Sequence, residues 1–226
     1  MTDAHCHVAR GETRHFLCAP FTGAAGAQDV LFDGCHPWDV DNIANFDEFI
    51  QKLRTRLGSV PTLGVGEIGL DRLKSKTISD AMRGAFAAQL AAAADFRRPV
   101  QLHGAKCWGE VVKACRPFAG RIPAFIFHGF SRSDGLLPDI CALGGFISIG
   151  PAILNDHAVN YRALAKKVPA ERLLVESDAT GLDEPSSVLS TTPRVEEVAA
   201  KLAEVRGTDL AELIAQLERN ADEVAP

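Results

Sequence analysis

Short, continuously apolar runs alternate along this chain with segments whose apolar residues recur at helical spacing. Strands that are apolar on both faces are typical of a parallel sheet that is buried on both sides, and helices connect such strands. The runs that we expect to be strands are residues 2–7, 14–19, 30–32, 62–65, 99–102, 124–127, 145–149 and 173–175. The expected helices are residues 45–57, 77–96, 108–116, 134–143, 155–167, 195–205 and 210–219.

Eight strands in this alternation, of which 14–19 is the weakest, predict a (β/α)8 barrel of the TIM type. An open doubly wound sheet is less consistent with the sequence, because no glycine-rich phosphate-binding turn follows the first strand. The segment between His7 and His36 contains no amphipathic helix and is too short for a full second βα unit. We therefore expect a barrel that is trimmed or distorted in its first βα units.

Composition limits the classes of protein that this chain can be. A length of 226 residues with 46% hydrophobic and 23% charged residues suits a globular protein, and we expect residues 1–226 to form a single barrel domain. No apolar run approaches the roughly 20 residues of a membrane helix, and residues 1–25 lack the pattern of a signal peptide. Six scattered cysteines without a CxxC pair are typical of a reduced, cytoplasmic protein. The net charge of −5 means that any contact with a polyanion must be local.

The first strand carries two histidines that can bind one metal ion. Side chains alternate between the two faces of a strand, so Asp3, His5 and His7 share one face, while Cys6 points to the other and should pack there. Further candidate ligands follow apolar runs at the points where strands should end: Glu67, His103, His128 and Asp178. The carboxyl ends of barrel strands meet at one mouth, so the sequence predicts a metal site there.

Each of these residues has a simpler interpretation when it is considered alone. A histidine that closes an apolar run, such as His103 or His128, can be a buried histidine with satisfied hydrogen bonds. Glu67 can cap a helix or form a salt bridge, although the flanking Gly66 and Gly69 indicate a close approach of another backbone. The order of the candidates along the chain favours the metal site.

The motifs resemble those of the TatD-type metal-dependent deoxyribonuclease family, within the amidohydrolase superfamily. They are DxHxH at 3–7, GCHP at 34–37, GEIGLD at 66–71, His103, His128, ESD at 176–178 and Asn220-Ala221. The resemblance implies a site with two divalent metal ions. His5 and His7 would bind one ion together with Asp178, His103 and His128 would bind the other, and Glu67 would bridge both. Asp178 would also act as general base, so Asp178 and Glu67 are the expected catalytic residues.

The chemistry of these side chains is consistent with the resemblance. Imidazole suits Zn²⁺, whereas carboxylates also accept Mg²⁺ or Mn²⁺, so the native metal stays open. A bridging carboxylate can hold two ions about 3.5–4 Å apart, which suits phosphodiester hydrolysis. The expected substrate is therefore a phosphodiester or a nucleic acid. Beside the ligands, Glu176 is expected to form hydrogen bonds and Asp3 to orient His5 or His7. His15 and His157 fit no motif and are expected at the surface or in loops.

Loops at the same mouth supply candidate substrate contacts. His36 resembles the substrate-side histidine of the family, and Arg72, Lys106 and Arg132 can bind phosphate together with Lys74. Ordinary solvated loop charges are the alternative for each of these cations. Three aromatic residues also follow strand ends, where they can either stack on a base or pack between barrel and helices: Trp38, Trp108 and Phe130.

Several positions on the substrate side depart from the family pattern. Gly104-Ala105-Lys106 follows His103, where the family has an arginine and an acidic residue, and Gly129 replaces a cysteine. Ala179-Thr180-Gly181 replaces the usual proline and asparagine-rich loop. A hydrolase is thus better supported than a deoxyribonuclease specifically. Hydrolysis of an amide, lactone or ester remains an alternative, as does a non-catalytic metal-binding member. The sequence leaves open the choice among DNA, RNA and a small phosphodiester, the oligomeric state, and whether the shortened 8–33 segment offers a surface to a partner.

Overall fold

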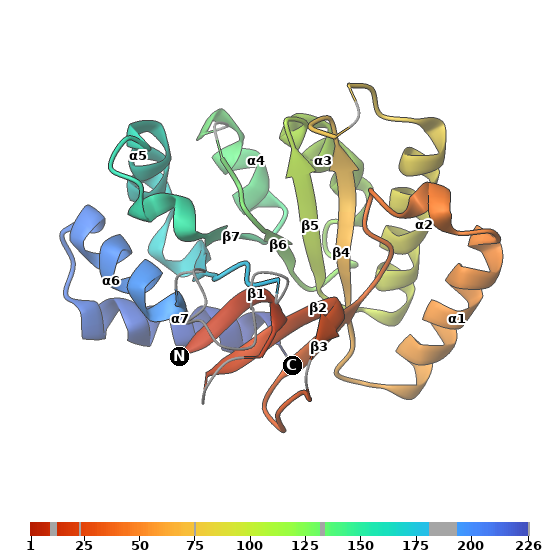
Figure 1. Cartoon of the computed structure of the whole chain (residues 1–226), viewed down its shortest axis with the longest axis horizontal. Coiled ribbons are helices and arrows are strands. Elements are labelled where there is room, and N and C mark those ends of the chain that lie inside the picture. Colours follow the sequence, from red (N-terminus) through yellow and green to blue (C-terminus); the bar gives the residue numbers. More distant parts are fainter. Residues whose placement is uncertain (10–12, 23, 75, 132–133, 181–193, 226) are drawn as a thin grey trace, which may run out of the picture.

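The eight strands form one parallel sheet in the order of the sequence, and the sheet curves into a barrel (Figure 1). The computed structural model describes residues 1–9, 13–22, 24–74, 76–131, 134–180 and 194–225. The strands are β1 (Thr2–Val8), β2 (Arg14–Thr22), β3 (Val30–Asp33), β4 (Gly64–Asp71), β5 (Val100–Ala105), β6 (Phe125–Phe127), β7 (Gly145–Ile149) and β8 (Leu173–Val175).

Backbone hydrogen bonds between the two ends of the sheet close the barrel. The amide of Asp178, just after β8, donates to the carbonyl of His5 over 3.0 Å, and the amide of His7 donates to the carbonyl of Ala179 over 2.7 Å. The predicted (β/α)8 barrel is therefore confirmed. These bonds also fix the position of Asp178 relative to the histidines of β1.

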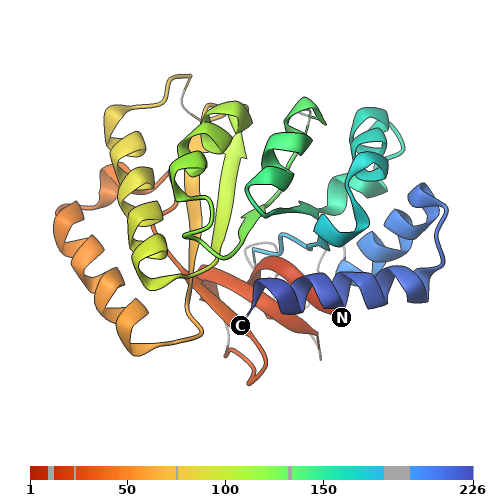
Figure 2. The same ribbon diagram turned by 180° about the vertical axis from the view of Figure 1, so that it is seen from behind.

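Helices cover most of the barrel. They are α1 (Phe46–Ser59), α2 (Asp80–Phe96), α3 (Trp108–Cys115), α4 (Leu137–Ala142), α5 (Val159–Lys167), α6 (Val195–Arg206) and α7 (Leu210–Val224). Short 3-10 helices lie at η1 (Val40–Asn42), η2 (Arg116–Phe118), η3 (Asp134–Leu136), η4 (Pro151–Leu154) and η5 (Ala170–Arg172). Seen from behind, α7 runs along the base of the barrel, where it contacts β8 and β1 (Figure 2).

The first two connections lack helices. In the residues that the structure describes between β1 and β3, no helix is present (Figure 1). The expected trimming of the first βα units is thus confirmed. Three helices begin at a side-chain cap: Asn45 accepts from the Glu48 amide at α1, Ser79 accepts from the Met82 amide at α2, and Asp209 accepts from the Ala211 amide at α7.

Strand β4 is longer than predicted, and this changes the setting of Glu67. The sequence places the end of the strand at residue 65, but β4 continues to Asp71 and pairs with β5 as far as Ala105. Glycine permits this pairing, because a Cβ atom on Gly69, which has φ +153°, would lie 2.0 Å from the carbonyl oxygen of His103. Glu67 and His103 therefore lie within strands and not beyond their ends.

A register irregularity in β4 turns Glu67 towards the barrel interior. Val65 and Ile68 both pack in the core cluster that contains the helices, although residues three apart on a regular strand face opposite sides. The register in which β4 pairs with β5 shifts between Val65 and Ile68, and this irregularity allows both side chains to face the helices. On β5, Val100 and Leu102 face the helices, so Gln101 and His103 share the interior face with Glu67.

Candidate metal centre

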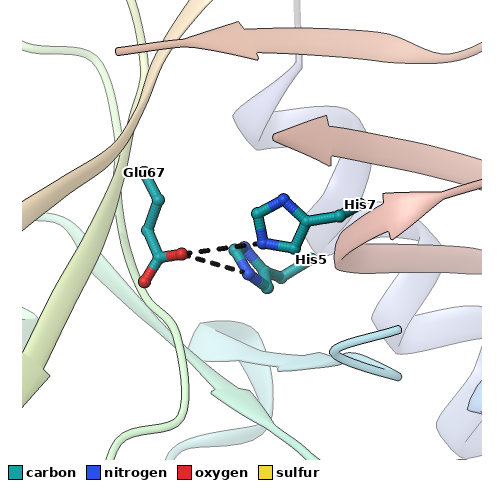
Figure 3. A group of neighbouring side chains, drawn as sticks. All are labelled: His5, His7 and Glu67. Carbon is teal, nitrogen blue, oxygen red and sulfur yellow. Dashed lines mark ion pairs between the residues drawn. The ribbon is translucent and has the colours of Figure 1, made fainter. Parts of the chain in front are cut away.

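The carboxylate of Glu67 is the centre of the site, and its two oxygens face different histidines. Its Oε2 atom lies 3.5 Å from His5 Nε2 and 3.8 Å from His7 Nε2 (Figure 3). Its Oε1 atom lies 2.7 Å from His103 Nδ1 and 3.8 Å from His128 Nε2. The side chain is almost fully buried, so this carboxylate faces the histidines and not bulk water.

His5 presents a free nitrogen to this carboxylate because Gln101 holds its other nitrogen. The Gln101 side chain donates from Nε2 to the carbonyl of Ala4 over 2.8 Å, so its Oε1 must be the atom that faces His5 Nδ1 at 2.7 Å. An amide oxygen only accepts, so His5 Nδ1 carries the hydrogen and Nε2 carries the lone pair. This Nε2 atom is buried and has no hydrogen-bond partner among the described residues.

His7 and His128 are oriented in the same way. His7 Nδ1 donates to the carbonyl of Cys18 over 2.9 Å, which leaves Nε2 to face Glu67. His128 Nδ1 lies 3.0 Å from Oε1 of Glu176, and the same oxygen accepts from the Gly129 amide over 2.9 Å. The predicted hydrogen-bonding role of Glu176 therefore agrees with its contacts. In His5 and His7 a hydrogen bond from Nδ1 to a protein acceptor orients the ring and aims Nε2 at the centre, as is usual for metal-ligating histidines, and in His128 the ion pair with Glu176 takes its place.

His103 and His36 have the opposite arrangement. His103 donates from Nε2 to Oδ2 of Asp71 over 2.8 Å, so its Nδ1 is the atom that faces Glu67. His36 accepts the Trp38 backbone amide on Nδ1 over 3.1 Å, so the hydrogen of its neutral ring is on Nε2. That Nε2 atom lies 3.6 Å from Oε1 of Glu67, which makes His36 a donor directed into the site.

All six predicted metal ligands lie together, but their grouping differs in part from the prediction. Within each group of three the candidate ligand atoms lie within 4.8 Å of one another: His5 with His7 and Glu67, His5 with His128 and Asp178, and His36 with Glu67 and His103. His128 and His103 both face Oε1 of Glu67, but the ring of His128 also stacks on that of His5 with centroids 3.7 Å apart. His36, expected to contact only substrate, lies inside the cluster.

The distances around His5 suit a divalent cation better than hydrogen bonds, whereas the 2.7 Å between Glu67 Oε1 and His103 Nδ1 is a hydrogen-bond distance. Two ligand atoms that are each about 2.1 Å from one Zn²⁺ ion lie about 3.4 Å apart at a tetrahedral angle. His5 Nε2 lies 3.5 Å from Glu67 Oε2 and 3.7 Å from Asp178 Oδ1, which is close to that separation. The partnerless, buried Nε2 of His5 therefore fits the lone pair of a metal ligand.

Burial and mutual charge shift the titration of these groups. Burial, together with the neighbouring His128, lowers the pKa of His5 to about 4, so its ring is neutral at pH 7. Burial would raise the pKa of Glu67, but His128, His103 and His36 together hold it well below its usual range. Burial opposes the protonation of His128, yet Glu176, Asp178 and Glu67 raise its pKa well above the usual value. The carboxylates therefore create a negative potential that attracts a cation.

The basic side chains that were predicted to contact substrate differ in their surroundings. Arg72 forms an ion pair with Glu110, which neutralises its charge. Lys106 is exposed and lines a cavity of about 430 Å³ beside His103 and His128. Arg132 lies outside the described residues.

Asp178, whose side chain is 49% exposed, has φ +52° and lies at the open side of the cluster.

The structure also places the other histidines, Asp3 and the three aromatic residues that the sequence analysis named. His15 is not a surface residue: it is buried in β2, and its Nδ1 lies 3.0 Å from Oδ1 of Asp29. Asp3 accepts the backbone amides of Ser177 and His5, so it fixes the backbone and not a histidine ring. His157 is exposed, as expected. Of the aromatic residues, Trp108 and Phe130 are buried against each other, and Trp38 alone is 45% exposed.

Two residues that the sequence analysis did not single out support the site. Gln101 orients His5, and its signal in the sequence was a lone polar residue inside the apolar run 99–102. Asp71 was noted only as part of a motif, yet its fully buried side chain accepts from the ring of His103, the indole of Trp38 and the backbone of the next loop.

A parallel barrel with a histidine and carboxylate cluster towards the carboxyl ends of its strands is typical of metal-dependent hydrolases. The family model described as TatD related DNase matches residues 24–225. The chain therefore belongs to the TatD-related DNase family and is an enzyme of the hydrolase class. The match begins after His7, so the His5 and His7 pair lies outside it.

Individual relatives agree with this assignment. The chain is 29% identical over 198 residues to the 3'-5' ssDNA/RNA exonuclease TatD of Pectobacterium atrosepticum, which covers 84% of this chain and 75% of that protein. It is 32% identical over 145 residues to the enzyme of the same name from Edwardsiella piscicida, covering 64% of this chain and 53% of the relative. The crystal structure of YjjV, a TatD homologue from Escherichia coli, has the same fold, with a TM-score of 0.79, 22% identity and coverage of 99% and 97%.

Proposed function

We propose that residues 1–226 act as a single hydrolase domain that cleaves phosphodiester bonds in nucleic acid with the help of two divalent metal ions. The observation that carries this proposal is the placement of Glu67, whose two carboxylate oxygens face separate sets of histidines. One carboxylate that reaches two sets of ligands is the arrangement that a two-metal site requires.

His5, His7 and Asp178 would hold one ion, His103 and His128 the other, and Glu67 would bridge them. When bound, such ions lower the pKa of water and neutralise charge on the attacking and leaving oxygens. The chain itself orients the ligands through Gln101, Glu176 and Asp71, whose contacts are described above.

Two side chains face the reacting atoms with complementary roles. Asp178 is half exposed at the open side of the cluster, where its carboxylate can accept the proton of the attacking water. His36 directs an N–H group into the site, so it can donate a hydrogen bond to a phosphate oxygen. Asp178 would thus accept the proton that hydrolysis releases, and His36 would stabilise the negative charge on the phosphate oxygen.

We propose single-stranded nucleic acid as the substrate, because the relatives that match most of this chain are named as exonucleases that act on single-stranded DNA and RNA. The net charge of −5 restricts phosphate contacts to local cations such as Lys106 at the cavity. In the described part of the chain no helix is long and apolar enough to cross a membrane. Buried thiols such as Cys18 and Cys115 support a reducing, cytoplasmic location.

The test is hydrolysis of bis(p-nitrophenyl) phosphate with added Mg²⁺, Mn²⁺ or Zn²⁺, with bound metal measured on the same samples. We expect metal-dependent turnover that falls at least about 100-fold in Asp178→Ala and in Glu67→Gln. Glu204→Gln is the matched control, because Glu204 is an exposed carboxylate that pairs with Lys201 on α6. Two bound ions without turnover would redirect the proposal to amide, lactone or ester substrates, and protein that binds no metal would refute the site.

A further inference from the structure

One large aromatic side chain beside the metal centre is exposed. Trp38 follows His36 in the loop after β3, and it is 45% exposed, whereas the other tryptophan, Trp108, is 6% exposed. The Trp38 ring lies edge-on to the ring of His36, with centroids 4.7 Å apart, and 6.0 Å from that of His103. An apolar surface at this place lies next to the reacting groups.

The exposed indole is held in a fixed position. Its Nε1–H donates to Oδ2 of Asp71 over 2.9 Å, and the same oxygen accepts from His103. Oδ1 of Asp71 accepts the amides of Leu73 over 2.6 Å and Lys74 over 2.7 Å. One buried carboxylate thus fixes the indole, the loop after β4 and a candidate ligand of the metal centre as one unit. A fixed aromatic face loses little conformational entropy when a planar ligand stacks on it.

The same unit carries a positive charge. The ammonium group of Lys74 lies 4.9 Å from the centroid of the Trp38 ring. Within the described residues Lys74 forms no ion pair with a carboxylate, in contrast to Arg72, which is paired with Glu110. Leu73, which is 61% exposed, adjoins them and also lines the cavity beside His103 and His128. The surface of Trp38, Leu73 and Lys74 therefore combines a flat apolar face with an available cation.

We propose that Trp38 and Lys74 form a subsite for one nucleotide of a single-stranded substrate, next to the bond that is cleaved. The base stacks on the indole, and the ammonium of Lys74 moves from the ring to the adjacent phosphate. Stacking platforms combined with local cations are how proteins bind single strands without strong sequence preference. A paired base in a duplex keeps its face covered by its neighbours, so this subsite selects unpaired nucleotides. The inference rests on the proposed nuclease function, which it deepens.

The test compares an oligothymidylate with an oligonucleotide of the same length whose residues lack bases. Binding is followed in EDTA by the fluorescence anisotropy of a dye attached to the oligonucleotide, so that it is measured without hydrolysis and with the same reporter in every variant. We expect oligothymidylate to bind the wild-type protein, and Trp38→Ala to weaken this binding roughly 5- to 100-fold. The variant should bind the abasic strand as the wild type does. Trp38→Phe, which keeps a stacking ring but loses the bond to Asp71, should retain most of the affinity.

Lys74 is tested by the salt dependence of the same binding. Lys74→Ala should reduce the slope of log affinity against log salt by about 0.7, the value for one phosphate contact on a single strand. Lys74→Arg should restore the slope. Lys113→Ala on α3 removes an exposed cation remote from Trp38 in sequence and is the charge control.

The outcomes separate this inference from the proposed function. Equal weakening of intact and abasic strands by Trp38→Ala would overturn the subsite, even if the enzyme cleaves DNA or RNA. Tighter binding of the intact strand than of the abasic strand, with a difference that Trp38→Ala abolishes, would support the subsite even if no nucleic acid were cleaved. In an active enzyme, Trp38→Ala should also lower kcat/KM more for the oligonucleotide than for bis(p-nitrophenyl) phosphate.

Discussion

At the scale of single residues, the geometry of the site depends on polar contacts that fix the orientation of the histidine rings. Gln101 does this for His5, because its own orientation is fixed by the carbonyl of Ala4. An apolar residue at position 101 would leave His5 Nδ1 buried without an acceptor. The ring could then satisfy Nδ1 only by turning, which would withdraw Nε2 from Glu67.

We therefore predict that Gln101→Leu weakens metal binding about 10- to 100-fold, the usual cost of losing a group that orients a ligand. The affinity is measured by competition with a chromophoric chelator. Cys18→Ala is the control, since it removes a second donor to Gln101 Oε1 but keeps the bond to His5. If both variants bound metal as the wild type does, Gln101 would have only a packing role.

At the scale of elements, the close pairing of β4 with β5 brings Glu67 and His103 together. Gly69 allows this pairing, since its φ is +153° and a Cβ atom would lie 2.0 Å from the carbonyl oxygen of His103. We predict that Gly69→Ala separates the strands and destabilises the fold by more than about 3 kcal/mol, because backbone cannot yield as a flexible side chain does.

The matched control for this variant is Gly84→Ala in α2, where a Cβ atom would meet nothing within 4 Å. That substitution should stabilise the protein by about 1 kcal/mol through helix propensity. Urea denaturation followed by circular dichroism measures both variants. Similar midpoints for the two would contradict the assignment of Gly69 to a close backbone contact.

Helix α7 closes the base of the barrel through one buried side chain. Asn220 donates from Nδ2 to the carbonyls of Ala170 and Leu173, each over 2.7 Å, and accepts from Gln216. We predict that Asn220→Ala costs about 2–4 kcal/mol of unfolding free energy, because two carbonyls lose their donor. Gln216→Ala, which leaves both carbonyls bonded, should cost less than half as much. Chemical denaturation of the two variants checks the ratio.

At the scale of the whole molecule, the barrel was predictable from the sequence because apolar strands and amphipathic helices alternate regularly along the chain. Apolar runs and helical spacing located every strand and the seven longer helices, although β4 and α7 extend well beyond their predicted ends. No helix was expected before β3, and none is present in the described residues there. What was missed depends on contacts between distant residues. The register irregularity that turns Glu67 inward, the burial of His15 against Asp29 and the stacking of His5 on His128 are set by neighbouring strands, and no local pattern encodes them.

The candidate metal centre also joins segments from both ends of the chain, so a metal ion bound there should stabilise the entire barrel. Its candidate ligands come from β1, β4, β5 and the residues after β6 and β8. A ligand at 100 times its Kd adds about 2.7 kcal/mol per site, which for a chain of this size raises Tm by about 5–11 °C. We predict this rise on adding Zn²⁺ or Mn²⁺ to EDTA-treated protein in a calorimeter. Glu67→Gln should lose most of it and Glu204→Gln none, whereas a Tm that ignores metal in the wild type would mean that these side chains do not form a metal centre.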